Sequence, residues 1–150
     1  MNLLFCINQK FQPLLLQCLR SIARKGGEPE YDVYILHSDL GETDRAAIRA
    51  QAPGCFRLHF VAVDPKDFDG FPESKRYPRQ IYYRLAAPLL LPETLDRILY
   101  LDVDTIVINP LREFYDTDFE GSGYIACTHI REALTKFNDL RLKVPENSPY

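Results

Sequence analysis

Two aspartates, Asp102 and Asp104, are separated by a single residue and follow the apolar run 97–101. Such a run predicts a buried strand, and burying an unpaired carboxylate costs several kcal/mol. The pair therefore needs a bound cation or a solvated crevice, and ligands of open α/β sheets lie in a crevice at the carboxyl ends of strands. Oxygen ligands with this spacing suit Mg²⁺ or Mn²⁺ shared with a diphosphate. The alternative is a plain turn at the end of the strand.

The Asp-x-Asp pattern also occurs at residues 67–69 and 116–118. Both of these pairs lie close to glycines, which favour turns together with aspartate. We therefore expect them to be solvated loop carboxylates. Only the pair at 102 and 104 follows a hydrophobic strand, which makes it the candidate metal or catalytic site.

The loop at residues 7–11 follows the first predicted strand, where mononucleotide-binding sheets hold their ligand. It contains no Gly-x-Gly-x-x-Gly, which excludes a dinucleotide fingerprint. Asn8 can pair with the edge of a base, and Phe11 can stack on it. The alternative is an ordinary loop asparagine and a phenylalanine that packs at the start of a helix.

Arg84 lies within an otherwise apolar segment, residues 80–91, that predicts a helix. An arginine in such surroundings must reach either solvent or an anion. Its partner is thus a phosphate of a ligand or a structural carboxylate.

The elements that must position these residues alternate along the chain. Segments 3–7, 31–37, 56–63, 97–101 and 124–128 predict strands, and segments 13–25, 40–51, 80–91, 110–115 and 130–138 predict helices or helical turns. Segment 64–78, rich in proline and charge, predicts an irregular loop that either covers a site or is a surface excursion. The alternation indicates one α/β domain of three layers with a mostly parallel sheet.

Composition narrows the possible partners. The net charge of −3 gives no indication of a basic surface, so we expect no nucleic-acid partner. The four cysteines are far apart and predict buried thiols in a reducing compartment, not a zinc site or a disulfide framework. No signal peptide and no apolar stretch of about 18 residues is evident, so we expect no transmembrane segment and a cytoplasmic protein.

The run Arg97-Ile-Leu-Tyr-Leu-Asp-Val-Asp-Thr-Ile-Val, preceded by Tyr83-Arg84-Leu85, resembles glycosyltransferase family 8. That family includes bacterial lipopolysaccharide galactosyl- and glucosyltransferases and glycogenin. Segments 64–68, 110–111 and 115–118 extend the resemblance over nearly the whole chain. It implies a Rossmann-like nucleotide-sugar-binding domain of the GT-A type. It also implies a hexosyltransferase that moves a hexose from a UDP-sugar to a saccharide or lipopolysaccharide-type acceptor with retention of configuration, at the inner face of the membrane.

The resemblance also implies roles for individual residues. Asp102 and Asp104 would bind Mn²⁺ or Mg²⁺, which holds the diphosphate, and the main chain of Val103 would contact the ribose. Arg84 would lie against the donor sugar and phosphates. The loop would bind uracil through Ile7, Asn8 and Phe11.

Several positions depart from the family pattern. Phe11 stands where the family more often has tyrosine, Asn8 where it usually has an aspartate that accepts the uracil N–H, and Lys10 where it has asparagine. His129 falls on the stretch that would face the acceptor, where a structural histidine is the alternative. The family's later motifs, including a histidine that is the third metal ligand, follow about where this sequence stops. We therefore expect residues 1–150 to be the nucleotide-sugar-binding portion of one glycosyltransferase domain, truncated at its C-terminus, inactive alone and prone to self-association.

Two other functions remain open. Asp102-Val-Asp104-Thr105 also matches the Asp-x-Asp-x-Thr start of haloacid dehalogenase-like phosphatases, in which the first aspartate is a nucleophile. There the motif usually ends the first strand, whereas here three predicted strands precede it. A non-catalytic nucleotide-binding fragment or subunit is the second alternative.

Overall fold

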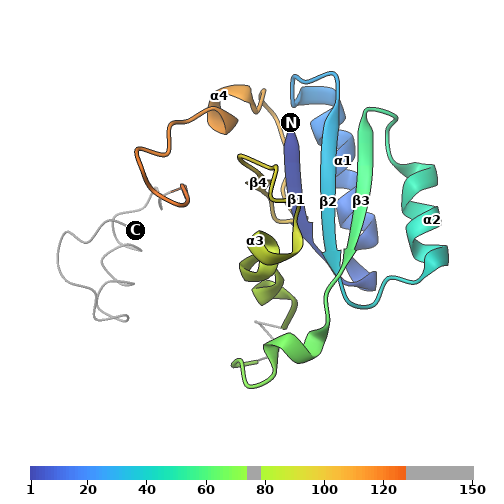
Figure 1. Cartoon of the computed structure of the whole chain (residues 1–150). Helices are drawn as coiled ribbons and strands as arrows, with labels where there is room; N and C mark the ends of the chain where they lie inside the picture. Colours follow the sequence, from blue (N-terminus) through green and yellow to red (C-terminus); the bar gives the residue numbers. More distant parts are fainter. Residues whose placement is uncertain (74–78, 128–150) are drawn as a thin grey trace, which may run out of the picture. The chain divides into compact units, whose positions relative to one another are not determined.

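Four parallel strands form the centre of the fold (Figure 1). The strands are β1 (Asn2–Cys6), β2 (Tyr31–His37), β3 (Phe56–Ala62) and β4 (Leu99–Tyr100). They lie in the order β3-β2-β1-β4, and every pairing is parallel. The computed structural model describes residues 1–73 and 79–127, and the chain divides into two units, residues 1–116 and 117–150.

Helical segments connect the strands. They are η1 (Gln9–Phe11), α1 (Gln12–Lys25), α2 (Glu42–Gln51), η2 (Pro65–Phe68), η3 (Arg79–Ala86), α3 (Ala87–Leu90) and α4 (Arg112–Tyr115), where η denotes a 3-10 helix. Pro13 lies in the first turn of α1, where its missing N–H costs nothing. Arg24 and Lys25 lie in the last turn, where the helix dipole favours positive charge.

Alternate residues of the strands point to opposite faces of the sheet and build two cores. Leu3, Phe5 and Ile7 pack with the apolar side of α1 and with Ile48 of α2. Leu4 points the other way, into a second cluster with Phe68 of η2 and with residues of η3 and α3. Both faces of the sheet are therefore covered, which confirms the predicted three-layer α/β arrangement.

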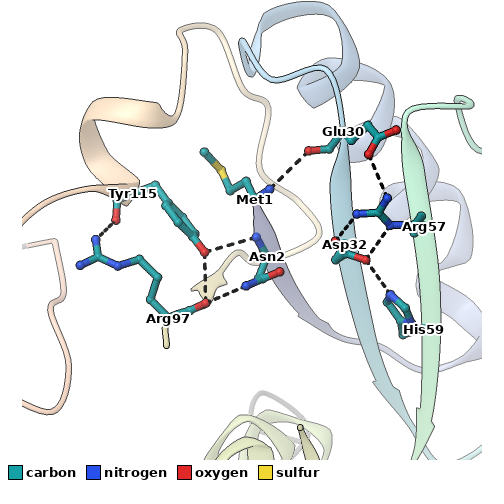
Figure 2. A network of polar contacts seen from close by, with 8 residues as sticks. All are labelled: Met1, Asn2, Glu30, Asp32, Arg57, His59, Arg97 and Tyr115. Atoms are coloured by element: carbon teal, nitrogen blue, oxygen red, sulfur yellow. Dashed lines mark hydrogen bonds and ion pairs between the residues drawn. The ribbon is translucent and has the colours of Figure 1, made fainter. Parts of the chain in front are cut away.

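An ion-pair network joins the two strands at the β3 edge of the sheet (Figure 2). Arg57 donates to both oxygens of Asp32 at 2.9 and 2.7 Å and to Glu30 at 2.9 Å. The hydrogen bonds from Arg57, with a further one from His59, hold the pKa of Asp32 well below its usual range. The pairs are partly exposed, so their contribution to stability is modest. These ion pairs lie in the amino-terminal half of the two strands, β2 and β3.

The segment predicted as a helix at residues 80–91 is helical, but mostly not α-helical. Residues Arg79–Ala86 form a 3-10 helix, and only Ala87–Leu90 form a turn of α-helix. Pro88 lies in the first turn of α3 and has no N–H to bond the carbonyl of Arg84 four residues earlier, so an α-helix is interrupted at this point. A continuous α-helix through this segment is therefore unfavourable.

Other predictions are corrected near the end of the described chain. β4 is shorter than the predicted strand at 97–101, and residues 124–127 form no strand. Tyr124 is 73% exposed, and β-forming residues need a neighbouring strand to pair with. Cys127 is exposed, contrary to the buried thiols we expected, whereas Cys18 is buried. Residue 128, the predicted helix at 130–138 and His129 lie outside the described residues.

Within residues 64–73 the predicted irregular loop begins with a short 3-10 helix and is anchored by a buried phenylalanine and by ion pairs of Asp69 and Glu73 with Arg79. Asp64 accepts a hydrogen bond from the Lys66 N–H at 2.9 Å and begins η2, and Phe68 is buried in the second core. The part of the chain that the structure describes contains no helix long and apolar enough to cross a membrane.

Candidate functional site

The carboxyl ends of β1, β2 and β4 meet at one edge of the sheet. Leu4 pairs with Tyr100, and Cys6 pairs with Leu36, so the residues that follow each strand emerge together. The loop at 7–11 and the Asp102–Asp104 pair are therefore neighbours in space, as ligand-binding loops are in open α/β sheets. We call this edge the carboxyl edge of the sheet.

The Asp pair lies on a turn that ends β4. The Leu101 N–H still donates to the Leu4 carbonyl at 3.1 Å, whereas the Thr105 N–H donates to the carbonyl of Asp102 at 3.1 Å. Both carboxylates are exposed, and Val103 between them packs against the core beneath α1. The turn thus gives both carboxylates the access to solvent that unpaired charges require.

A clamp of polar contacts holds both sides of this turn to the start of β1 (Figure 2). The Asn2 side chain donates to the Arg97 carbonyl at 3.2 Å, and the Asn2 N–H donates to the Tyr115 hydroxyl at 3.3 Å. Tyr115 in turn donates to the same Arg97 carbonyl at 3.1 Å, and the Arg97 guanidinium bonds the Tyr115 carbonyl. Residues on either side of the Asp pair are therefore tied to the central strand of the sheet.

Behind the turn, two backbone contacts fasten the chain to α1. The Val107 N–H donates to the Ser21 hydroxyl at 2.9 Å, and the Leu111 N–H donates to the Gly26 carbonyl at 2.9 Å. A Cβ at Gly26 would lie 2.3 Å from the Tyr31 hydroxyl, so only glycine fits there.

Arg84 lies close to the Asp pair. Its guanidinium carbon is 5.0 Å from the centre of the Tyr100 ring, and the Tyr100 hydroxyl donates to Asp102 Oδ1 at 2.5 Å. Among the described residues, Arg84 forms no ion pair with a carboxylate; its Nε donates to the Ile81 carbonyl at 2.9 Å. The sequence left two partners open for Arg84, a phosphate of a ligand or a structural carboxylate. Within the described residues no carboxylate pairs with it.

The pKa of the Cys6 thiol reflects the proximity of Arg84 and Asp102. Burial raises the pKa of the Cys6 thiol to about 12; the positive charge of Arg84 opposes this shift, and the negative charge of Asp102 adds to it. Burial likewise raises the pKa of Tyr100, followed by its hydrogen bond to Asp102. Cys6 is therefore a neutral thiol at neutral pH and no nucleophile.

The loop after β1 is organised by its own asparagine. Asn8 Oδ1 accepts from the Lys10 N–H at 3.0 Å and caps η1, while the buried Ile7 donates its N–H to the Leu36 carbonyl at 3.0 Å. A base N–H would have to share the Asn8 oxygen through its second lone pair. Phe11 is 40% exposed, so its ring is available to a ligand and is not a core residue.

Two acidic residues that sequence reasoning missed hold this loop against the next one. Both oxygens of Asp39 accept from the Gln9 N–H at 3.2 Å, and Asp44 accepts from the side chains of Gln12 at 2.9 Å and Gln9 at 3.2 Å. Hydrogen bonds from Gln12, Gln9 and the Gly41 N–H lower the pKa of Asp44. The only sequence signal was acidic residues around the start of the second predicted helix.

His37 ends β2 at the same edge and is buried with 4% exposure. Its Nδ1 accepts from the Leu40 N–H at 3.3 Å, which places the proton of the neutral ring on Nε2. That Nε2 has no hydrogen-bond partner within the described structure. Burial and then the charge of Arg45 lower the pKa of His37, while Asp39 opposes the shift.

This histidine predicts a loss of stability in mild acid. The lowered pKa means that the unfolded chain binds the proton more readily, so stability is full above about pH 6.5 and falls below it. In thermal melts, His37→Asn, which keeps an acceptor for Leu40 but cannot gain a proton, should lose less stability than the unaltered protein between about pH 7 and pH 5. Equal losses in the two proteins would contradict this.

The carboxyl edge of the sheet offers two carboxylates to a small, hard divalent ion. Residues 1–73 and 79–127 contain no cluster of three or more histidine, cysteine, aspartate or glutamate side chains that could hold a metal. Asp102 and Asp104 supply carboxylate oxygens, which Mg²⁺ and Mn²⁺ prefer. Mg²⁺ typically binds through one or two carboxylates with water and substrate phosphates completing its shell, and the pair fits this pattern.

A cavity of about 400 Å³ lies elsewhere, between the end of α2 and β3. It is separated from β4 by β2 and β1. Its two arginines are engaged, because Arg57 binds Asp32 and Glu30 and Arg49 donates to the Leu58 carbonyl at 2.8 Å. The exposed polar turn on β4, and not this cavity, is the candidate site.

Solved structures share this fold. The galactosyltransferase LgtC, crystallised with donor and acceptor sugar analogues, matches with a TM-score of 0.71 and 29% identity over 79% of this chain and 43% of its own. GlyE of Streptococcus pneumoniae matches with a TM-score of 0.53 and 19% identity over 99% of this chain and 40% of its own. The fold is thus the GT-A type of nucleotide-sugar-dependent glycosyltransferases.

Comparison of the sequence with known families agrees with the comparison of the structures. The model of "Glycosyl transferase family 8" matches residues 2–149, and this chain belongs to that family. A Haemophilus influenzae protein named "Putative glycosyltransferase" is 26% identical over 129 residues, which are 85% of this chain and 38% of that protein. The chain therefore spans less than half the length of the relatives described here.

Proposed function

We propose that this chain forms the donor-binding part of a hexosyltransferase. The enzyme transfers a hexose from a UDP-sugar to a saccharide acceptor with retention of configuration, using Mn²⁺ or Mg²⁺. The observation that carries the proposal is the carboxyl edge of the sheet. A carboxylate pair, an arginine with no carboxylate partner among the described residues and the loop with an exposed phenylalanine occur together there. Membership in glycosyltransferase family 8 supports it and favours it over a phosphatase.

Each group has a task in this proposal. Asp102 and Asp104 hold the ion, Arg84 adds positive charge beside the diphosphate, and Phe11 stacks on uracil. Ile7 and the main chain of Val103 complete the nucleoside contact. Breaking the bond from sugar to phosphate leaves negative charge on the departing UDP, and stabilising that charge is the main task of the site. The bound ion supplies Lewis-acid chemistry there. No carboxylate is assigned as a nucleophile.

The test is turnover of the donor. The 150-residue chain and a longer version with the downstream coding sequence are incubated with UDP-glucose or UDP-galactose and Mn²⁺, and release of UDP and the anomeric configuration of the product are measured by NMR. Metal-dependent release with retained configuration is expected, at least from the longer protein. UDP binding without turnover in both would identify a non-catalytic nucleotide-binding protein. Phosphate release through an aspartyl-phosphate would identify a phosphatase.

The partners follow from the same proposal. The acceptor is a saccharide of the lipopolysaccharide type, and the enzyme works in the cytoplasm at the membrane's inner face. Leu85 and Leu89 are 64% and 86% exposed on η3 and α3. Exposed apolar surface favours association, so we extend the proposal to self-association, which light scattering measures.

Phe11→Ala tests the uracil contact. Loss of stacking should cost about 1–3 kcal/mol of UDP affinity, as for other bases stacked on aromatic side chains. Because the ring is 40% exposed, its removal should change the melting temperature little. Phe114→Ala is the matched control, since Phe114 is 41% exposed on α4. Calorimetric titration with UDP should separate the variants, and unchanged affinity with a collapsed melting temperature would make Phe11 a packing residue.

A further inference from the structure

We propose that Tyr100 is a positioning residue that selects the metal ion. Its hydroxyl engages one oxygen of Asp102, so that the other oxygen alone binds the ion, which favours Mn²⁺ and Mg²⁺ over Ca²⁺. The inference rests on the proposed function, because it concerns the ion that the Asp pair would hold. It assigns to Tyr100 a role that neither the spacing of the aspartates nor the resemblance indicated.

The geometry that carries the proposal is a hydrogen bond between neighbours on a strand and its turn. Tyr100 is the last residue of β4 and pairs with Leu4 of β1. Its hydroxyl donates to Asp102 Oδ1 at 2.5 Å, a short bond of the charge-assisted kind. Strand pairing fixes the backbone of Tyr100, so the bond orients the carboxylate and not the reverse.

The tyrosine ring is itself held on both sides. One side packs against the second core, where Tyr100 is partly buried beside residues of η3 and α3. The guanidinium of Arg84 lies over the ring, 5.0 Å from its centre, and such cation contacts favour a fixed aromatic position. A hydroxyl held in this way can maintain one orientation of Asp102.

This orientation discriminates between ions through their coordination. Mg²⁺ takes six ligands in near-octahedral geometry at about 2.0–2.1 Å, and one oxygen of a carboxylate satisfies each position. Ca²⁺ takes about 6–8 oxygens at about 2.3–2.6 Å and often binds both oxygens of one carboxylate. A hydrogen bond that occupies Oδ1 weakens this second mode. Groups that hold a ligand by hydrogen bonds typically change metal affinity by about 10–100-fold when removed.

The experiment compares Tyr100→Phe with Tyr34→Phe. The first removes the hydroxyl and keeps the ring beneath Arg84. The second removes a hydroxyl from another tyrosine of the same core, which makes no hydrogen bond to the Asp pair. Binding of Mn²⁺ in the presence of UDP is followed by the loss of the electron paramagnetic resonance signal of the free ion, and Ca²⁺ and Mg²⁺ are added as competitors.

Tyr100→Phe should weaken Mn²⁺ binding by about tenfold or more and reduce the preference for Mn²⁺ over Ca²⁺ by a similar factor. Tyr34→Phe should leave both quantities unchanged. An equal loss for all ions would show local damage, and an unchanged preference would show that the hydroxyl has no effect; either result overturns the inference alone. If the unaltered protein binds no Mn²⁺ with UDP, the proposed function fails and the inference fails with it.

Discussion

Asp104→Asn is expected to weaken Mn²⁺-dependent binding of UDP by about tenfold or more. The substitution removes one of the two carboxylate charges that the proposed site offers the ion, and the described residues supply no further cluster of ligands to replace it. Because the proposed site offers the ion only a few ligands from the protein, the loss of one of them should lower the affinity for the ion strongly. The isosteric amide keeps the size of the side chain, which confines the change to charge.

Calorimetric titration with UDP, with and without Mn²⁺, measures the effect. Asp67→Asn is the matched control, because it removes a carboxylate from another Asp-x-Asp sequence, in η2. The control should bind UDP like the unaltered protein. Equal affinity of Asp104→Asn and the unaltered protein would remove the pair from the metal site.

The same variant should keep or gain thermal stability. Asp102 and Asp104 are like charges one residue apart, and without an ion their repulsion disfavours the folded turn. Loss of binding without loss of stability would therefore assign the defect to the site and not to the fold.

Phe5→Ala is expected to lower the free energy of unfolding by about 3–5 kcal/mol. Phe5 lies on β1, the strand between β2 and β4, and its side chain is fully buried against α1. Removing the ring loses its transfer free energy and leaves a cavity that the packed strands cannot close. Urea denaturation followed by circular dichroism measures the change.

Phe114→Ala is the control for this prediction as well, since its ring on α4 is 41% exposed. It should change the free energy of unfolding by less than about 1 kcal/mol. Domains of this size are stable by only about 5–15 kcal/mol, so Phe5→Ala is expected to remain folded but with a markedly lower urea midpoint. A midpoint equal to that of Phe114→Ala would place Phe5 outside the core.

Sequence patterns by themselves determined the framework of this protein. The apolar runs of β1 and β2, the alternation in β3 and the helical spacing of Leu15, Leu19 and Ile22 in α1 are local features of the sequence. The position of the Asp pair at a strand end also follows locally, because charges do not continue a buried strand. The three-layer parallel fold was predictable for these reasons.

Where tertiary context competes with local preference, the sequence predicted less well. Residues Arg79–Ala86 form a 3-10 helix, although the apolar spacing of this segment suits an α-helix. Tyr124 to Cys127 favour a strand by composition, yet within the described residues they pair with none. Asn8, which the resemblance places at the base, uses its oxygen to cap η1.

Only the tertiary structure decided how the site is assembled. The clamp of Asn2, Arg97 and Tyr115 joins residues from the two ends of the first unit, and no spacing rule relates them. The bond from Tyr100 to Asp102 depends on how the turn at Asp102 rotates the carboxylate back toward the strand, and Arg84 reaches the same ring from a different element. Such contacts depend on where packing places distant segments of the chain, whereas sequence periodicity describes only the backbone of each segment.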